Sequence, residues 1–223
     1  MKNSFGIKPD FAIPALQYDP TPTGESPRIL AAAGCNPANE SGQQVAGRLL
    51  GPQRQMTRKV HIGIDNGFTG AMALLDQNQI FCRPVPVINL GKYRLLDVSG
   101  CTELLQEMIA MAQTPLENVL AVFEQSSIVP KFGAKNNYLN GQNNEFWRVL
   151  LFSNKVPFAW VNAQEWQKHI FAGIRGTNTA AKAELVRRQR FPNYNVSGLK
   201  KSEIEGVNDA LCIALWARET RGS

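Results

Sequence analysis

The sequence has no long uninterrupted run of apolar residues. Most runs are only a few residues, as in Val149-Leu150-Leu151-Phe152, and the longest, ALCIALWA at 210–217, has eight. A helix that crosses a bilayer needs about 20 such residues, so an integral membrane protein is excluded. We also expect no secretory signal, because five prolines interrupt residues 1–30 where an apolar segment would be needed.

Cysteine and histidine are scarce and far apart. The four cysteines stand at 35, 82, 101 and 212, no two form a CxxC pair, and the only histidines are His61 and His169. This argues against a structural zinc site. A chain of this length can build a core without disulfides, so we expect free thiols in a reducing compartment.

The composition is that of a globular protein. The 223 residues are 43% hydrophobic and 19% charged, with a net charge of +6. Residues 1–55 hold seven of the 13 prolines and show no periodic apolar pattern. We predict that 1–55 is a dispensable extension or sequence translated from a misplaced start before Met56, with a transit peptide as a weaker alternative. Residues 56–223 are then the folded domain.

Hydrophobic periodicity predicts the elements of this domain. Strands are expected at Lys59–Asn66, Gly70–Asp76, Gln79–Val87, Asn118–Glu124 and Val156–Val161. Helices are expected at 102–113, 143–153, Ala163–Ile170, 179–190 and 202–218, with Asn162 and Ser202 as N-caps. This order predicts an α/β fold: a mixed five-stranded sheet, three strands antiparallel and then two parallel, with helices on both faces.

Four carboxylates suggest chemistry. Asp65 and Glu124 each end an apolar strand, where an anion is costly, and Glu205 and Asp209 lie one turn apart on the last helix. Clustered carboxylates demand a cation, and all-oxygen ligands favour Mg²⁺ or Mn²⁺. Two such ions can catalyse phosphodiester hydrolysis. Taken singly, each residue has a plainer interpretation: Asp65-Asn66-Gly67 as a strand-to-turn transition, and the two glutamates as solvated side chains.

Several segments resemble one known family. VHIGIDNGFTGAMAL (60–74) and AVFEQ (121–125) resemble the first two motifs of RuvC-like Holliday junction resolvases, members of the RNase H-like superfamily. VNDALCIALWA (207–217) resembles the family's last helix, and NAQEWQKHIF (162–171) with KAELV (182–186) resembles the basic segment before it. The resemblance implies an RNase H-like fold and a metal-dependent crossover junction endodeoxyribonuclease. It also implies that Asp65, Glu124 and Asp209 are catalytic metal ligands.

One position departs from the family's pattern. Many members have their fourth acid three residues before the last Asp, where this chain has Gly206. Glu205 is a helical substitute and completes the predicted set of catalytic ligands for two Mg²⁺ or Mn²⁺ ions. Such a Glu resembles the chloroplast and phage-like branch. If Glu205 points away, Glu203 or a water has to serve.

Basic residues surround the acids in sequence. Residues 125–201 hold 12 Lys or Arg against three acids, a local net charge of +9. A basic surface beside a metal-binding pocket suits a nuclease, although a solvated basic face is the plainer interpretation. Lys168 and Lys182 match basic family positions near the scissile phosphate. We predict DNA contacts at Lys131, Phe132, Lys135, Lys168, Arg175 and Lys182, with Phe132 either wedging between bases or packing in the core.

The leading hypothesis is an enzyme that nicks two opposed strands of a four-way DNA junction. The junction is two-fold symmetric, so a homodimer is expected, and the location is cytoplasmic and nucleoid-associated or, as a weaker alternative, organellar. A non-catalytic protein that binds branched DNA is the main alternative, supported by Gly206. An actin-like kinase is a third, because Asp65-x-Gly67-x-Thr69 resembles its first phosphate loop, but the second loop is missing.

Overall fold

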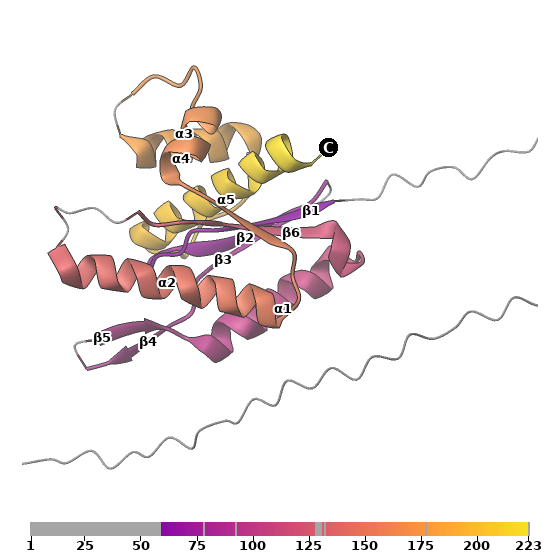
Figure 1. The fold of residues 1–223 in the computed structure, drawn as a ribbon. Coiled ribbons are helices and arrows are strands. Elements are labelled where there is room, and N and C mark those ends of the chain that lie inside the picture. The colour runs from indigo at the N-terminus through magenta and orange to yellow at the C-terminus, as the bar shows by residue number, and fades with distance from the viewer. Residues whose placement is uncertain are drawn as a thin grey trace, which may run out of the picture. The chain divides into compact units, whose positions relative to one another are not determined.

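A mixed five-stranded sheet forms the centre of the fold (Figure 1). In spatial order its strands are β3 (Ile80–Pro84), β2 (Ala71–Leu75), β1 (Val60–Ile64), β6 (Val119–Glu124) and β7 (Phe158–Val161). β1 pairs antiparallel with β2, and β2 with β3, whereas β1–β6 and β6–β7 are parallel. The predicted fold class, three antiparallel strands followed by two parallel ones, is confirmed.

The computed structural model describes residues 59–77, 79–91, 93–127, 131, 133–176 and 178–222. The predicted extension at 1–55 and the aromatic residue Phe132 lie outside these ranges. Both remain predictions from the sequence.

Helices cover both faces of the sheet (Figure 1). α1 (Val98–Ala112) and α2 (Gly133–Ser153) bury one face, and α3 (Ala163–Ile170), α4 (Thr179–Arg190) and α5 (Lys201–Arg221) bury the other. Because side chains alternate along a strand, Val60, Ile62 and Ile64 of β1 pack toward α1 and α2. The residues between them, and Asp65 after them, therefore face α5.

α5 packs directly on β1 because one residue of the strand has no side chain. A Cβ built on Gly63 would lie 2.2 Å from the carbonyl oxygen of Ala210, closer than any real contact. The glycine lets the α5 backbone approach the sheet at the level of Asp209. The central strand and the last helix are thus held together next to the predicted acids.

Four elements differ most from the prediction. β4 (Val87–Leu90) and β5 (Tyr93–Leu96) form a separate two-stranded sheet, which was not predicted. α1 begins at Val98 because the Asp97 side chain caps it by accepting from the Ser99 amide. α2 begins at Gly133, ten residues before the predicted start at 143.

The two predicted N-caps had opposite outcomes. Asn162 caps α3, its side chain accepting from the Glu165 amide at 2.9 Å, so this prediction is confirmed. Ser202 as the cap of α5 is wrong, because the helix begins at Lys201 and Lys200 occupies the cap position. The Glu203 carboxylate accepts from the Lys200 amide at 2.8 Å and supplies the missing acceptor at this helix end.

Cys82, Cys101 and Cys212 are all buried and free. Among the helices of the described ranges, none is long and apolar enough to cross a membrane.

Candidate metal and nucleic-acid site

The parallel pairing of β1 and β6 puts Asp65 and Glu124 side by side. The ladder pairs Ile64 with Phe123, and the next step along each strand is Asp65 and Glu124. Both side chains point to the α5 face, where Asp209 lies. We call Asp65, Glu124, Glu205 and Asp209 the acidic site.

Asp65 is held by the turn that follows β1. Its Oδ1 accepts from the Gly67 amide at 3.2 Å, and its own amide donates to Ala71 O at 3.0 Å. Burial raises the pKa of Asp65 to about 6, and the Gly67 hydrogen bond opposes that rise.

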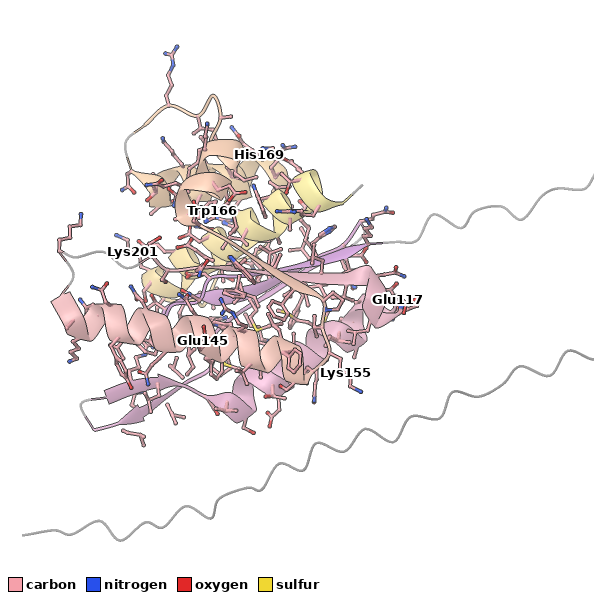
Figure 2. The ribbon with its side chains drawn as sticks, in the orientation of Figure 1. Glu117, Glu145, Lys155, Trp166, His169 and Lys201 are labelled. Carbon is pink, nitrogen blue, oxygen red and sulfur yellow. The ribbon has the colours of Figure 1, made fainter. Side chains whose placement is uncertain are left out.

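Glu124 is held by a tryptophan from α3. The buried Trp166 donates from Nε1 to Glu124 Oε2 at 2.8 Å. Burial raises the pKa of Glu124 to about 7; the Trp166 hydrogen bond lowers it and the charge of Asp65 raises it further. Trp166 and His169 both lie on α3, on the α5 side of the sheet (Figure 2). The sequence prediction missed Trp166, whose only signal was its place in the basic segment NAQEWQKHIF.

Asp209 brings the third element into the acidic site. Burial is the largest cause that raises the pKa of Asp209 to about 8, followed by the charges of Asp65, Glu124 and Glu205. The other three carboxylates therefore each lie within electrostatic reach of Asp209. Glu205 is exposed, whereas the other three are partly buried.

Close packing of α5 against the β1–β2 turn explains why residue 206 is a glycine. It forms an isolated bridge with Gly70, and a Cβ at Gly206 would lie 2.2 Å from the carbonyl oxygen of Thr69. α5 therefore touches the β1–β2 turn at this point, and no side chain fits. The fourth acid cannot stand at 206 in this chain, and Glu205 is the nearest carboxylate on the exposed side. Glu203 instead caps α5.

The donor chemistry fits a divalent cation, although the ligands are not gathered in advance. Within the described ranges, no three His, Cys, Asp or Glu side chains form a group that could hold a metal ion as they stand. The fit rests instead on the electrostatics. Three partly buried carboxylates with raised pKa values repel one another when ionised, and a hard cation with oxygen ligands would relieve that repulsion.

Known proteins resemble this chain in structure. No protein-family model matches it, and no curated protein matches it in sequence. Among solved structures, Thermus thermophilus RuvC is 13% identical, with a TM-score of 0.42 over 72% of this chain and 96% of that one. RuvC from T. thermophilus in complex with a Holliday junction substrate is 14% identical, with a TM-score of 0.41 and the same coverage. Similarity at this level transfers no residue roles to this chain.

The predicted DNA contacts are distributed around the α3–α4 region and the start of α2. Lys131, Lys135 and Arg175 are exposed. Lys168 is exposed and lines a cavity with Trp216 and Arg221. Lys182 is half-buried, with its Nζ 5.9 Å from the centre of the Phe171 ring.

Some of the basic residues at 125–201 form contacts within the protein. Arg187 is buried and donates to Asn208 Oδ1 at 2.8 Å, so it braces α4 against α5 and is not a surface cation. Arg188 pairs with Glu184 at 2.6 Å. Fewer basic side chains are therefore available to contact nucleic acid than the 12 Lys and Arg at 125–201 suggest.

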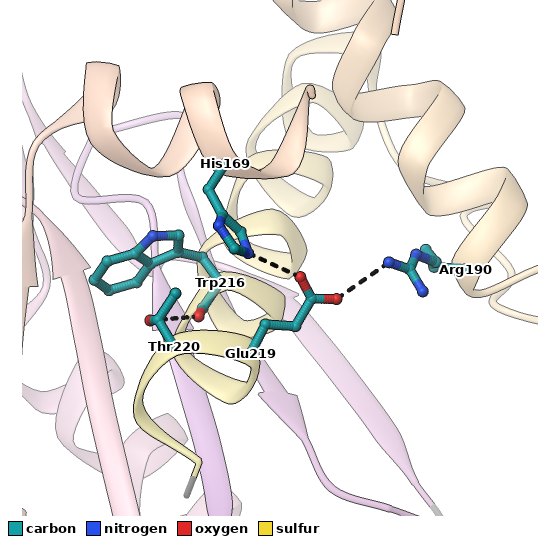
Figure 3. Close-up of polar contacts among 5 residues, drawn as sticks. All are labelled: His169, Arg190, Trp216, Glu219 and Thr220. Atoms are coloured by element: carbon teal, nitrogen blue, oxygen red, sulfur yellow. Dashed lines mark hydrogen bonds and ion pairs between the residues drawn. The ribbon is translucent and has the colours of Figure 1, made fainter. Parts of the chain in front are cut away.

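A polar cluster fastens the C-terminal half of α5 to its neighbours (Figure 3). Glu219 accepts from Arg190 of α4 at 3.1 Å and meets His169 of α3 at 3.0 Å. The cluster joins three helices, α3, α4 and α5. It lies about three turns along α5 from Asp209 and is separate from the acidic site.

Proposed function

We propose that this protein is a metal-dependent, structure-selective endodeoxyribonuclease that resolves four-way DNA junctions by paired phosphodiester hydrolysis. The observation that carries the proposal is the convergence of Asp65, Glu124 and Asp209 from β1, β6 and α5, since the pKa of Asp209 responds to both other charges. Partly buried acids that repel one another have a stability cost. A catalytic metal site gives a reason to retain them.

Asp65, Glu124 and Asp209, with Glu205 at the rim, would hold two Mg²⁺ or Mn²⁺ ions. Bound there, the ions supply an activated water for attack on phosphorus and stabilise the leaving oxygen. The chain's own contribution is orientation. The Gly67 amide fixes one oxygen of Asp65, and the Trp166 indole fixes one oxygen of Glu124, so that the other oxygens can face the cations.

The surrounding cations would hold the DNA. Lys168 of α3 and Lys182 of α4, whose helices pack on the α5 side of the sheet, would contact the phosphates beside the cleaved bond. Arg175 and the segment with Lys131, Phe132 and Lys135 would contact the arms of the junction. Neutralising phosphates releases counterions, so binding would weaken steeply as salt is raised.

The two-fold symmetry of a four-way junction calls for two acidic sites, hence a homodimer. An exposed apolar surface on α2, formed by Tyr138, Val149 and Phe152, supports it. We call these three residues the α2 apolar surface.

A second candidate is a branched-DNA-binding protein with weak or no catalysis. It is favoured by the exposed position of Glu205 and by the tight contact at Gly206, which together leave the fourth ligand at the rim. Cleavage of junction, fork, flap and linear duplex with Mg²⁺ and with chelator separates the two candidates.

The direct test is to neutralise single acids. Asp65→Asn and Asp209→Asn should each lower junction cleavage by more than about 100-fold, because each removes a ligand of the cations. Junction binding in chelator should stay within about two-fold of wild type, because the lysines and arginines that bind phosphate are untouched. Glu117→Gln, on the 3₁₀ turn η1 (Leu116–Asn118) before β6 (Figure 2), is the control and should cleave normally.

Thermal unfolding shows whether a loss of cleavage reflects misfolding. A raised pKa means that the folded chain holds the Asp209 proton more tightly than the unfolded chain does, so stability is lost as pH rises from 3.8 toward about 8. Without divalent cations, Asp209→Asn should therefore raise Tm by about 3–8 °C at pH 8.5, and by much less at pH 5. Full cleavage by either Asn variant would remove the acidic site from the mechanism.

A further inference from the structure

A closed set of hydrogen bonds links the two loops that carry Asp65 and Glu124. Asn66 follows Asp65, Ser126 stands two residues after Glu124, and Asn144 projects from the middle of α2. Asn66 and Asn144 are 4% and 8% exposed. The three side chains lie on three elements that are distant in sequence.

Asn144 is at the centre of this network. Its Oδ1 accepts from Asn66 Nδ2 at 2.7 Å and from the Ser126 amide at 3.1 Å. Its Nδ2 donates to the Ser126 carbonyl oxygen at 3.0 Å. The Ser126 hydroxyl closes the set by donating to Asn66 Oδ1 at 3.1 Å. All the side-chain polar atoms of the three residues have partners.

The backbone of Ser126 fixes how Asn144 is oriented. An amide N–H can only donate and a carbonyl oxygen can only accept, so Asn144 must present Oδ1 to the first and Nδ2 to the second. Asn66 must then point its Nδ2 at Asn144 Oδ1. Only a carboxamide of this length satisfies both peptide groups, which distinguishes Asn144 from a residue that merely fills space.

The network spans the place where the β1–β6 ladder ends. The last pair is Ile64 with Phe123, so the β1–β6 register does not extend to the residues beyond Asp65 and Glu124. Two ionised carboxylates side by side at this point repel each other and favour separation of the two chains. A bond between the residues beyond each carboxylate opposes that separation.

We propose that Asn144, acting through Asn66 and Ser126, is a positioning residue that sets the spacing of Asp65 and Glu124 and thereby the affinity of the acidic site for divalent cations. This inference rests on the proposed function. Asn144 touches neither carboxylate, so its effect is on metal affinity and not on the chemistry of cleavage. The position of α2 on the opposite face of the sheet is thereby linked to the acidic site.

The test compares full-length wild type, Asn144→Ala and Asn154→Ala. Asn154→Ala is the control, because it replaces another asparagine and removes a side-chain hydrogen bond to α2, the 2.8 Å bond to Leu150 O, without touching the network. Mn²⁺ binding is measured by calorimetry well below Tm, and junction cleavage is measured across a Mg²⁺ titration. Asn144→Ala should bind Mn²⁺ about ten-fold more weakly and need correspondingly more Mg²⁺, while its rate at saturating Mg²⁺ approaches wild type.

Each outcome decides the inference. Asn154→Ala should keep the wild-type metal affinity even if its Tm falls. An Asn144→Ala variant that is folded and binds Mn²⁺ as tightly as wild type overturns the inference alone. If Asn144→Ala does not fold, Ser126→Ala decides, because it deletes only the hydroxyl link to Asn66; about two- to three-fold weaker binding supports the inference and equal binding overturns it. A wild-type chain that binds no Mn²⁺ overturns the proposed function and this inference with it.

Discussion

His61 is a buried imidazole in the central strand. It lies on β1 between Leu75 of β2 and Leu120 of β6, is 1% exposed, and neither ring nitrogen has a hydrogen-bond partner among the residues that the structure describes. Burial, followed by the charges of Arg218 and Lys59, lowers its pKa to about 4. His61 is therefore neutral at neutral pH and acts as part of the core under α5.

This burial predicts a pH dependence of stability. The folded-state pKa of His61 lies below the ordinary value of 6.5, so the unfolded chain takes up its proton first. The stability that depends on a neutral His61 is fully present above pH 6.5 and is lost as pH falls toward 4. His61→Leu should remove about 1–3 kcal/mol of the acid destabilisation seen in wild type, measured by urea unfolding at intervals from pH 7 to pH 4. Parallel curves for the two proteins would show that His61 is not the group responsible.

At the scale of elements, the contact between α5 and the β1–β2 turn determines whether Asp209 reaches Asp65. Gly206→Ala puts a Cβ 2.2 Å from Thr69 O, which α5 can relieve only by moving away. We expect a loss of about 1–3 kcal/mol in stability and weaker binding of divalent cations. Gly141→Ala is the control, because nothing lies near a Cβ there in α2, and it should stabilise by about 0.5–1 kcal/mol. Equal effects of the two substitutions on Tm would contradict the close contact.

How far the elements were predictable depends on which forces form them. Ala163–Ile170 was predicted with its exact bounds, because a capping Asn and an apolar face specify it locally. The first ten residues of α2 were missed, because Gly and Asn there are poor helix formers and tertiary contacts at the buried Asn143 and Asn144 hold the helix. β4 and β5 were missed because their exposed apolar residues form no core pattern.

The residues of the acidic site and their supporting side chains also differ in how far the sequence predicts them. Strand-end acids and an i,i+4 pair are visible in sequence, so Asp65, Glu124 and Asp209 could be predicted to meet. Trp166 and Asn144 could not, because their partners lie 42 and 18–78 residues away and are chosen only by the folded chain. Residues that bind a group leave a sequence pattern, whereas residues that orient those groups leave little.

At the scale of the whole chain, the contribution of residues 1–55 can be measured. Residues 59–222, apart from the few positions not described, already supply an apolar layer on each face of the sheet. A chain that starts at Met56 should therefore unfold within about 2 °C of the full-length protein and cleave junctions at the same rate. Thermal unfolding and the cleavage assay, run side by side, check this; a collapse in Tm would show that the extension is part of the fold.

The homodimer prediction concerns the α2 apolar surface. Phe152 is 76% exposed and Val149 63%, so they contribute little to the fold of one chain, but burying them against a second copy would stabilise association. Phe152→Glu should therefore convert a dimer to a monomer while changing Tm little at low protein concentration, as measured by light scattering after gel filtration. Leu185→Glu, on an exposed apolar residue of α4, should leave the dimer intact. A monomer should nick junctions singly, because paired cuts need both acidic sites on one junction. A wild-type protein that is already monomeric, or a Phe152→Glu variant that remains a dimer, would show that the α2 apolar surface is not a dimer interface.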